Sequence, residues 1–508
     1  MLSLLFLCSR RLVSDHGSLR RALQLVPEEL YPVLFRAAFL DRKTLVLQDL
    51  VQRWPFPVLS LQRLLQGDEH QPQGQLYEPS NKLCLQTVIL GVMDYLRGEL
   101  AGQKEGRPPR RQRLRLLDMT GTHDDGLEQG PDTMSLWSRT VALAKSCIDI
   151  ARKQCEETVQ VSKRRKGAEV AGVALGSAHR SLYVEVRVDL FVNSTSYGVL
   201  REALLVSSHG PLRLQCRDIR AEELSLRSTV GLLELLNPNS LRQIDLRFNN
   251  LGLLGLNSLL PHMMRFTHLQ SLKLPYSNID VRRLSPAAEE NLHNLSSQIC
   301  RLPALRELNL GSSRLSGRLQ QLLRGLGTPL ESLELAFCYL LPADLYYLSQ
   351  SVHVSSLRKL DMSGNNLCDV LLQPFLRLLD SASSSLLYLD VMECKLDDSA
   401  LAALTPVLGR CRCLRYLGLL DNPVSGRGIK ALLLRSLHLA DLRLVIYPFP
   451  LECYLDLEMR PEDALIRDAE KTLQFEAEVQ EALVTAQRTD MVWTTDMVGH
   501  RPPEYLSS

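Results

Sequence analysis

Apolar residues recur in one fixed spacing over the second half of the chain. From Leu241 onward the spacing is L-x-x-L-x-L-x-x-N/C-x-L, and its copies begin at Leu241, Leu269, Leu305, Leu330, Leu357, Leu386 and Leu414, with a degraded copy at Leu439. Leucines two positions apart indicate a short strand with one buried face. Successive copies start 28, 36, 25, 27, 29, 28 and 25 residues apart, which leaves room for a helix after each strand.

This period predicts an α/β fold, a solenoid of leucine-rich repeats that spans residues 106–450. The ninth position of a repeat is Asn, Cys or Ser in every complete copy. We expect the Asn and Cys side chains to bind backbone groups that the turn after each strand would otherwise bury unpaired. The step of 36 residues marks an insertion between Ser285 and Ser297, which we expect to form an enlarged loop or a helix.

Weaker copies extend the array upstream. Leu212, Leu214 and Ile219 form one, Leu114, Leu117 and Met119 another, and a strand with alternating valines lies between them at Val184 to Leu190. A flexible insertion interrupts the array at about 124–180. Within it we expect a helix from Trp137 to Ile150 and then a mobile surface loop, RKQCEETVQVSKRRKG.

The end repeats of a solenoid need covers, because each would otherwise expose an apolar face. Residues 1–105 predict a helical N-terminal cap, with one helix from Leu83 to Leu96. Residues 451–508 predict a C-terminal cap with a helix from Glu462 to Arg488, whose residues Phe475, Val479 and Leu483 share a face. A short strand is expected at Met491 to Thr495.

Composition excludes several classes of protein. Of the 508 residues, 45% are hydrophobic and 23% are charged, which is typical of a folded globular chain, and the net charge of +2 provides no field for nucleic acid or a membrane surface. The 12 cysteines lack a pairing pattern, so we expect reduced thiols and a cytoplasmic protein. The basic run Lys163 to Lys166 is a candidate nuclear-import signal, although solvated loops collect such runs by chance.

No sequence motif indicates catalysis, a metal or a cofactor. Cys411 and Cys413 form a C-x-C without a second pair at zinc spacing. His123 with Asp124 and Asp125 is the one cluster of ionisable residues that invites a catalytic reading, but it lies in a glycine-flanked turn. The sequence therefore predicts a protein-binding chain that is not an enzyme.

Two short patterns at the N-terminus predict docking helices. Ser3, Leu4, Cys8 and Leu12 match the BC box, a helix that binds elongin C, and their spacing of four places them on one helical face. Val26, Pro27, Leu30 and Leu34 match the cullin-2 box, in which a proline begins a helix. Each pattern is loose, and the alternative is that both are ordinary helices of the cap. The first assignment requires Arg10 and Arg11 to face solvent.

Longer segments resemble the PRAME (preferentially expressed antigen in melanoma) family. The resemblance is carried by LVPEELYPVLFRAAF, LVQRWPFPVLSLQRLL, LRLLDMTG, VEVRVDLFVN, SGRLQQLLRG, PLESLELAFCYL and VIYPFPLECY. It implies a horseshoe of ribonuclease-inhibitor-type repeats that recruits elongin B/C and cullin-2 and holds an unknown protein substrate for ubiquitination. Elongin contact then falls on Leu4, Cys8 and Leu12, and cullin contact on Val26, Pro27, Leu30 and Leu34.

Two other functions remain open at this level. PEELYPVLF followed by Trp54 also resembles an F-box, the helical module that binds Skp1. The family resemblance also implies a stoichiometric scaffold that inhibits a kinase of the nuclear factor kappa B pathway without any ligase. Loss of elongin binding without loss of cellular effects distinguishes the scaffold from the ligase subunit.

Residues between the buried leucines are expected to line the concave face, because strand side chains alternate. The position before the last leucine of each strand is acidic in the middle of the array, and aromatic or thioether residues follow it. This pattern predicts a partner that offers Lys or Arg within an apolar patch. The predicted contact residues are Asp245, Tyr276, Glu334, Phe337, Asp361, Asp390 and Met392.

Overall fold

The computed structural model describes residues 3–65, 81–104, 114–121, 133–165, 182–282, 285–454 and 468–497. The chain forms two compact units. The first comprises Met1–Ala221 and Gly231–Leu241, and the second comprises Glu222–Val230 and Arg242–Ser508. Helix α9 (Leu226–Leu235) contains residues of both units.

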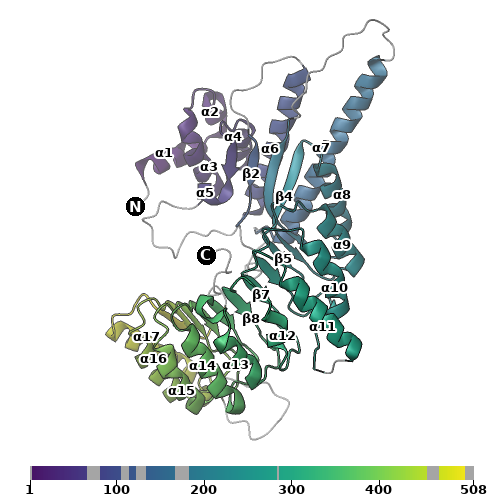
Figure 1. The fold of residues 1–508 in the computed structure, drawn as a ribbon. Coiled ribbons are helices and arrows are strands. Elements are labelled where there is room, and N and C mark those ends of the chain that lie inside the picture. The colour runs from purple at the N-terminus through teal and green to yellow at the C-terminus, as the bar shows by residue number, and fades with distance from the viewer. Residues whose placement is uncertain are drawn as a thin grey trace. The chain divides into compact units, whose positions relative to one another are not determined.

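Strands in each unit follow one another in sequence order, and every described pair is parallel (Figure 1). The first unit contains β1 (Val58–Ser60), β2 (Leu116–Asp118), β3 (Val184–Val192) and β4 (Leu212–Ala221). The second contains β5 (Gln243–Asp245), β6 (Ser271–Lys273), β7 (Glu307–Asn309), β8 (Ser332–Glu334), β9 (Lys359–Asp361), β10 (Tyr388–Asp390), β11 (Tyr416–Gly418), β12 (Leu444–Ile446) and β13 (Val492–Thr494). A helix follows nearly every strand, so the fold is an α/β solenoid of leucine-rich repeats, as predicted.

In the second unit the helices cover one face of the strands (Figure 1). They are α10 (Gly252–Met263), α11 (Pro286–Ile299), α12 (Leu319–Leu323), α13 (Pro342–Gln350), α14 (Leu372–Ala382), α15 (Asp398–Leu408), α16 (Gly426–Ser436) and α17 (Ala469–Thr485), with 3-10 turns η2 (Val354–Ser356), η3 (Asp369–Leu371) and η4 (Leu451–Cys453). The register aligns the central leucine of each strand with that of the next, as in Leu272, Leu308, Leu333 and Leu360. All four are fully buried, which makes the repeated leucine the spine of the core.

The ninth position has the predicted role where it is Asn or Cys, whereas the buried hydroxyls of Ser277 and Ser313 have no hydrogen-bond partner among the described residues. Asn365 is 2% exposed, and its amide donates to the carbonyl oxygens of Leu335 and Met362 at 2.9 and 2.8 Å. Its oxygen accepts from the backbone N–H of Leu340 at 3.3 Å. The Cys338 thiol donates to the carbonyl of Leu310 at 3.2 Å, so a thiol serves the same purpose in that repeat.

The first unit begins with helices that form the predicted N-terminal cap: α1 (Leu4–Val13), α2 (His16–Ala22), the 3-10 turn η1 (Glu28–Leu30), α3 (Tyr31–Leu40), α4 (Thr44–Gln52), α5 (Leu61–Leu65) and α6 (Lys82–Lys104). Helices α7 (Leu136–Arg165) and α8 (Tyr197–Ser207) follow. The sequence pattern missed β1, a strand of three residues within the cap that pairs with β2.

Three other predictions about local structure have outcomes. The insertion at Ser285 is helical, since α11 starts at Pro286 and the Ser285 hydroxyl caps it by accepting from the Ala288 N–H. The expected surface loop from Arg152 is wrong up to Arg165, because α7 continues to that residue. Phe475, Val479 and Leu483 form the buried face of α17, and β13 lies where a C-terminal strand was expected.

Candidate protein-interaction surfaces

Helix α1 has two apolar faces. Phe6, Ser9 and Val13 are buried, and the helix packs on α3. Leu4 and Leu12 are 78% and 52% exposed on the other side, with Cys8 exposed between them. The Ser3 hydroxyl accepts from the Phe6 N–H at 3.2 Å and so begins the helix at Leu4. The spacing of four therefore places the three predicted elongin contacts on one solvent-facing stripe.

The BC-box assignment requires the two arginines of this helix to face solvent, and they do. Arg10 and Arg11 are both exposed. The Arg10 guanidinium donates twice to the Asp41 carboxylate, at 2.9 and 2.7 Å. This bidentate pair, rather than burial, links the polar side of α1 to the end of α3.

The second box is only partly available to a partner. Pro27 is exposed and precedes η1, while Val26 and Leu30 are half-buried. Leu34 is 1% exposed and lies in the core of the N-terminal helices, so its predicted contact with cullin is wrong. The physical reason is that α3 is apolar around most of its circumference, with Tyr31, Phe35 and Ala38 also buried.

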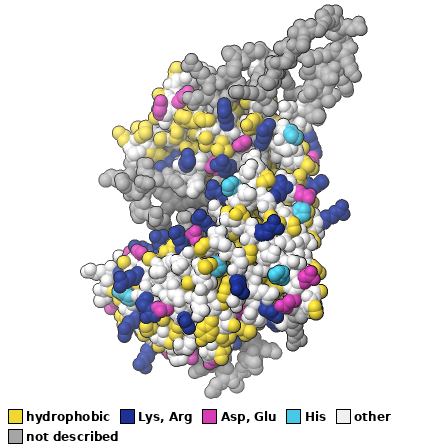
Figure 2. Space-filling view, viewed as in Figure 1, with side chains coloured by type: hydrophobic (Ala, Val, Ile, Leu, Met, Phe, Trp, Pro, Cys, Tyr) yellow, Lys and Arg dark blue, Asp and Glu magenta, His cyan; other side chains and the backbone are white. Residues whose placement is uncertain are grey.

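The F-box resemblance concerns residues of the same core. Trp54 is 3% exposed and meets Tyr31, Phe35 and Phe56 edge to face, with ring centroids 6.3, 5.7 and 5.7 Å away. Its indole N–H donates to the carbonyl of Val58. Trp54 therefore packs against the N-terminal helices and bonds to β1, and this structural role accounts for a tryptophan at this position without contact with Skp1. Figure 2 shows hydrophobic side chains, in yellow, gathered over the N-terminal helices.

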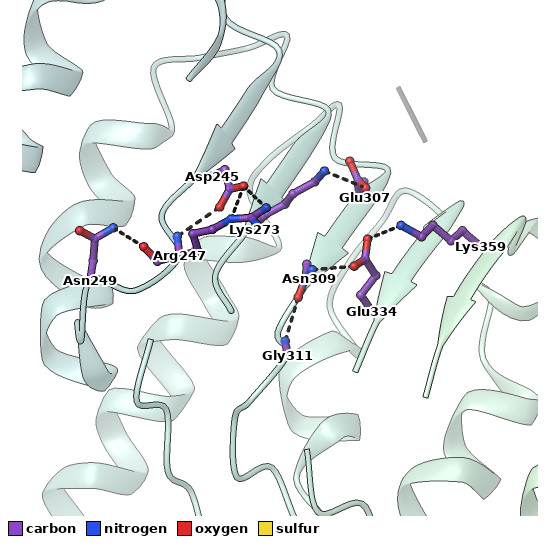
Figure 3. A network of polar contacts seen from close by, with 9 residues as sticks. All are labelled: Asp245, Arg247, Asn249, Lys273, Glu307, Asn309, Gly311, Glu334 and Lys359. Atoms are coloured by element: carbon purple, nitrogen blue, oxygen red, sulfur yellow. Dashed lines mark hydrogen bonds and ion pairs between the residues drawn. The ribbon is translucent and has the colours of Figure 1, made fainter. Parts of the chain in front are cut away.

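The strand face of the second unit carries the predicted acidic residues, but two of them, Asp245 and Glu334, are paired with cations (Figure 3). Asp245 is 2% exposed, and the Arg247 guanidinium donates to it at 2.8 Å. Lys273 on β6 lies 3.6 Å from the carboxylate of Glu307 on β7, and both side chains are buried. Asp245 is therefore not available to a partner.

Glu334 is held from both sides. The Lys359 ammonium donates to it at 2.8 Å, and the Asn309 amide donates at 2.7 Å (Figure 3). Glu307 and Lys359 stand two positions before Asn309 and Asp361, the residues that the sequence pattern placed on the concave face of these strands. Strand alternation predicts that both positions face the same side, yet the sequence analysis considered only one of them. The sequence analysis therefore missed Lys359, which pairs with Glu334. The middle of this face is not the free acidic strip that was predicted.

Asp361 and Asp390 are neighbours in the parallel register of β9 and β10. Burial, followed by the charge of Asp361, raises the pKa of Asp390 to about 7. Burial, followed by the charge of Glu334, also raises the pKa of Asp361. The Tyr416 hydroxyl donates to Asp390 at 3.3 Å. Both carboxyls are half-buried, and their contact with a partner stays a prediction.

Met392 also differs from its prediction. It is 9% exposed and packs in a cluster with Tyr388, Tyr416 and Ile446, which are all buried. Among the predicted contacts, Tyr276 and Phe337 are the exposed ones, at 51% and 38%. The accessible part of the predicted surface is thus aromatic, and it lies in the turns that follow the strands.

Two sequence predictions fall wholly or partly outside the described residues. His123, Asp124 and Asp125 lie there, as does Lys166. Lys163 to Arg165 end helix α7, where the backbone alone is described. Within the described ranges, no group of three or more His, Cys, Asp or Glu side chains is arranged to hold a metal ion. None of the helices in those ranges is long and apolar enough to cross a membrane.

Comparisons with known proteins agree with the family resemblance. The PRAME N-terminal domain model matches residues 2–125, and the PRAME C-terminal domain model matches residues 187–500. The chain is 64% identical to leucine-rich repeat-containing protein 14 of Xenopus laevis and 46% identical to that of Homo sapiens, each over the full length of both proteins. Among solved structures, a chain of the yeast Rad7 and Elc1 complex matches with a TM-score of 0.42 and 15% identity, over 91% of this chain and 94% of that chain. The chain belongs to the PRAME family and is similar over its whole length to leucine-rich repeat-containing protein 14.

Proposed function

We propose that this chain is a non-catalytic substrate-recognition subunit of a ubiquitin ligase. In this proposal it binds elongin B/C through α1 and cullin-2 through the segment around Pro27, and its repeats hold a protein substrate. The observation that carries the proposal is the second apolar face of α1. A cap helix buries its apolar stripe and exposes polar residues, whereas α1 buries one stripe and exposes Leu4, Cys8 and Leu12 on another.

The expected strength of this contact follows from the exposed area. Complete burial of a leucine side chain contributes about 1.5–3 kcal/mol. Leu4 is 78% exposed, so most of this contribution is still available to a partner. Loss of the Leu4 contact alone should weaken binding by roughly ten-fold or more, since 1.4 kcal/mol is a factor of ten. An aspartate at this position adds the cost of desolvating a charge.

The test measures elongin B/C binding to the full chain by isothermal titration calorimetry. Leu4→Asp should lower the affinity at least ten-fold and leave the thermal unfolding of the chain unchanged. Leu45→Asp is the matched control, because Leu45 on α4 is 60% exposed and lies outside both boxes. If both variants bind like the unmodified chain, the α1 assignment is wrong.

A second variant addresses cullin-2. Pro27→Asp changes an exposed residue ahead of η1 and should reduce co-purification of cullin-2 while elongin B/C stays bound. Co-purification of Skp1 without elongin C would instead support the F-box reading. Unchanged cellular effects of the chain carrying Leu4→Asp would support a stoichiometric scaffold, since such a scaffold does not need this helix.

A further inference from the structure

Four aromatic side chains stand exposed in three turns of the second unit, those after β5, β6 and β8. We call Phe248, Tyr276, Phe337 and Tyr339 the aromatic rim. They are 47%, 51%, 38% and 60% exposed, respectively. Each follows a strand within a few residues, so the rim lies beyond the carboxyl ends of β5, β6 and β8.

The backbone conformation at these four positions is unfavourable for aromatic residues. All four have positive φ, at 59°, 56°, 55° and 51°. A bulky side chain is unfavourable in this left-handed region, with a cost on the order of 1 kcal/mol per residue. Equivalent turns of other repeats use Ser312 and Gly364 at positive φ. The fold therefore does not require aromatic residues here, and between 38% and 60% of each of these side chains remains exposed.

Three of the rim residues, Tyr276, Phe337 and Tyr339, line an open pocket. The rings of Phe248 and Tyr276 stack with centroids 4.5 Å apart and planes 20° apart. Beside them is a pocket of about 320 Å³, lined by Tyr276, Asn278, Ile279, Ser312, Arg314, Phe337 and Tyr339. The ring of Phe337 lies over Gly364, where a Cβ atom would be 2.1 Å from it. The missing side chain of Gly364 thus allows Phe337 to form one wall of the pocket.

The charges at the pocket favour an acidic partner. The guanidinium of Arg314 donates to Asp280 at 3.3 Å, and that of Arg282 donates to the same carboxylate at 3.1 and 2.8 Å. One carboxylate therefore lies between two cations, which leaves a net positive charge. The side chains of Arg282 and Arg314 are 44% and 48% exposed, and each guanidinium has five N–H donors to offer. Arg282 also lies 5.9 Å from the ring centroid of Tyr339.

We propose that the aromatic rim and Arg314 bind an acidic peptide segment that inserts one aromatic or large apolar side chain into the pocket. This inference names the substrate class of the proposed adaptor and in that respect rests on the proposed function. It reverses the charge that the sequence pattern predicted for the partner. Peptide is favoured over nucleic acid because the net charge of +2 supplies no general attraction for a phosphate backbone.

The experiment selects peptides from a random twelve-residue phage library on the immobilised full chain and reads the enriched sequences. We expect an aromatic residue with Asp or Glu within three positions of it. The double variant Tyr276→Ala, Phe337→Ala should reduce the affinity of a selected peptide at least ten-fold. Arg314→Glu should shift the selection from acidic to basic flanking residues. Leu254→Ala is the control, because Leu254 is 69% exposed on α10 and does not line the pocket.

Three results would overturn the inference: no enrichment over a bare surface, enrichment that survives the rim substitutions, or tighter binding of a twelve-nucleotide single-stranded RNA than of the selected peptides. Elongin B/C binding of the same variants separates this inference from the proposed function. The rim variants should bind elongin B/C normally, and Leu4→Asp should bind the selected peptides normally. If the chain selects acidic aromatic peptides but does not bind elongin B/C, the result supports peptide binding at the rim and contradicts the proposed ligase function.

Discussion

Replacing Asp390 by asparagine should stabilise the protein at alkaline pH. Asp390 lies directly beside Asp361 in the register of β9 and β10, and its Oδ1 atom has no hydrogen-bond partner among the described residues. Burial and the neighbouring charge raise its pKa to about 7. An asparagine keeps the shape and removes the charge. Its amide also adds a donor that can meet the Asp361 carboxylate, and its oxygen can still accept from Tyr416.

The magnitude follows from proton linkage. The pKa of Asp390 is about 7 in the folded chain against an ordinary value of 3.8, so the folded state retains a proton that the unfolded state releases between these values. Stability from this group is therefore complete below pH 3.8 and is lost as the pH rises towards 7. At 1.36 kcal/mol per unit, a shift of about 3 units corresponds to at most about 4 kcal/mol. Because Asp361 titrates with Asp390, we expect Asp390→Asn to gain about 2–4 kcal/mol at pH 8 and much less at pH 5.

Hydrogen exchange read by mass spectrometry measures this locally. Peptides that span β9 to β11 should exchange at least ten-fold more slowly in Asp390→Asn than in the unmodified chain at pH 8, once intrinsic rates are corrected. The difference should shrink towards pH 5. Glu393→Gln is the control, since it removes an exposed carboxylate from the same repeat. An equal difference at both pH values, or faster exchange in Asp390→Asn at pH 8, would refute the reasoning.

The remaining predictions concern the two cores. Asn365→Ala should lower the free energy of unfolding of the second unit by about 3 kcal/mol, because it leaves the Leu340 N–H and the Leu335 carbonyl without the Asn365 side chain as a partner; urea unfolding measures the loss, and a change below 1 kcal/mol would contradict it. Leu34→Ala should cost about 2–5 kcal/mol in the first unit by opening a cavity. The same Leu34 variant should keep its cullin-2 affinity under conditions where it is folded, and a stable variant that loses cullin-2 would restore Leu34 as a contact.

Much of the fold could be predicted because the same pattern of buried and polar positions recurs in each repeat. A strand with leucines two apart needs a buried face, and a turn with an inward carbonyl needs a donor such as Asn365, so seven copies reinforce one another. The elements that were missed lack this repetition. Strand β1 has three residues and becomes a strand only by pairing with β2. The second half of α7 is polar and charged, which resembles a loop in composition even though it is helical.

The candidate sites were predicted less well because exposure depends on neighbours distant in sequence. The spacing in α1 identified a stripe correctly, but the same kind of spacing at Leu34 belongs to a helix that other helices surround. On the strands, the alternation of side chains predicted which residues face the concave side, but it did not predict which side chains of neighbouring strands pair with one another. Lys359 reaches Glu334 from a repeat 25 residues later, and this separation hides the pair from a reading of one strand at a time.

The two surfaces proposed for binding share one property, which is that the repeat architecture does not need them. The solenoid is closed by leucines, by asparagines and thiols in its turns, and by ion pairs such as Lys359 with Glu334, all of which are buried or satisfied within it. In the outward stripe of α1 and in the aromatic rim, several large apolar side chains remain exposed next to one another without such a role. Exposed leucine is common, but exposed aromatic residues at positive φ carry a conformational cost as well. The turns do not require aromatic residues, since Ser312 and Gly364 occupy equivalent positions at positive φ, so the rim is the stronger indication of a partner.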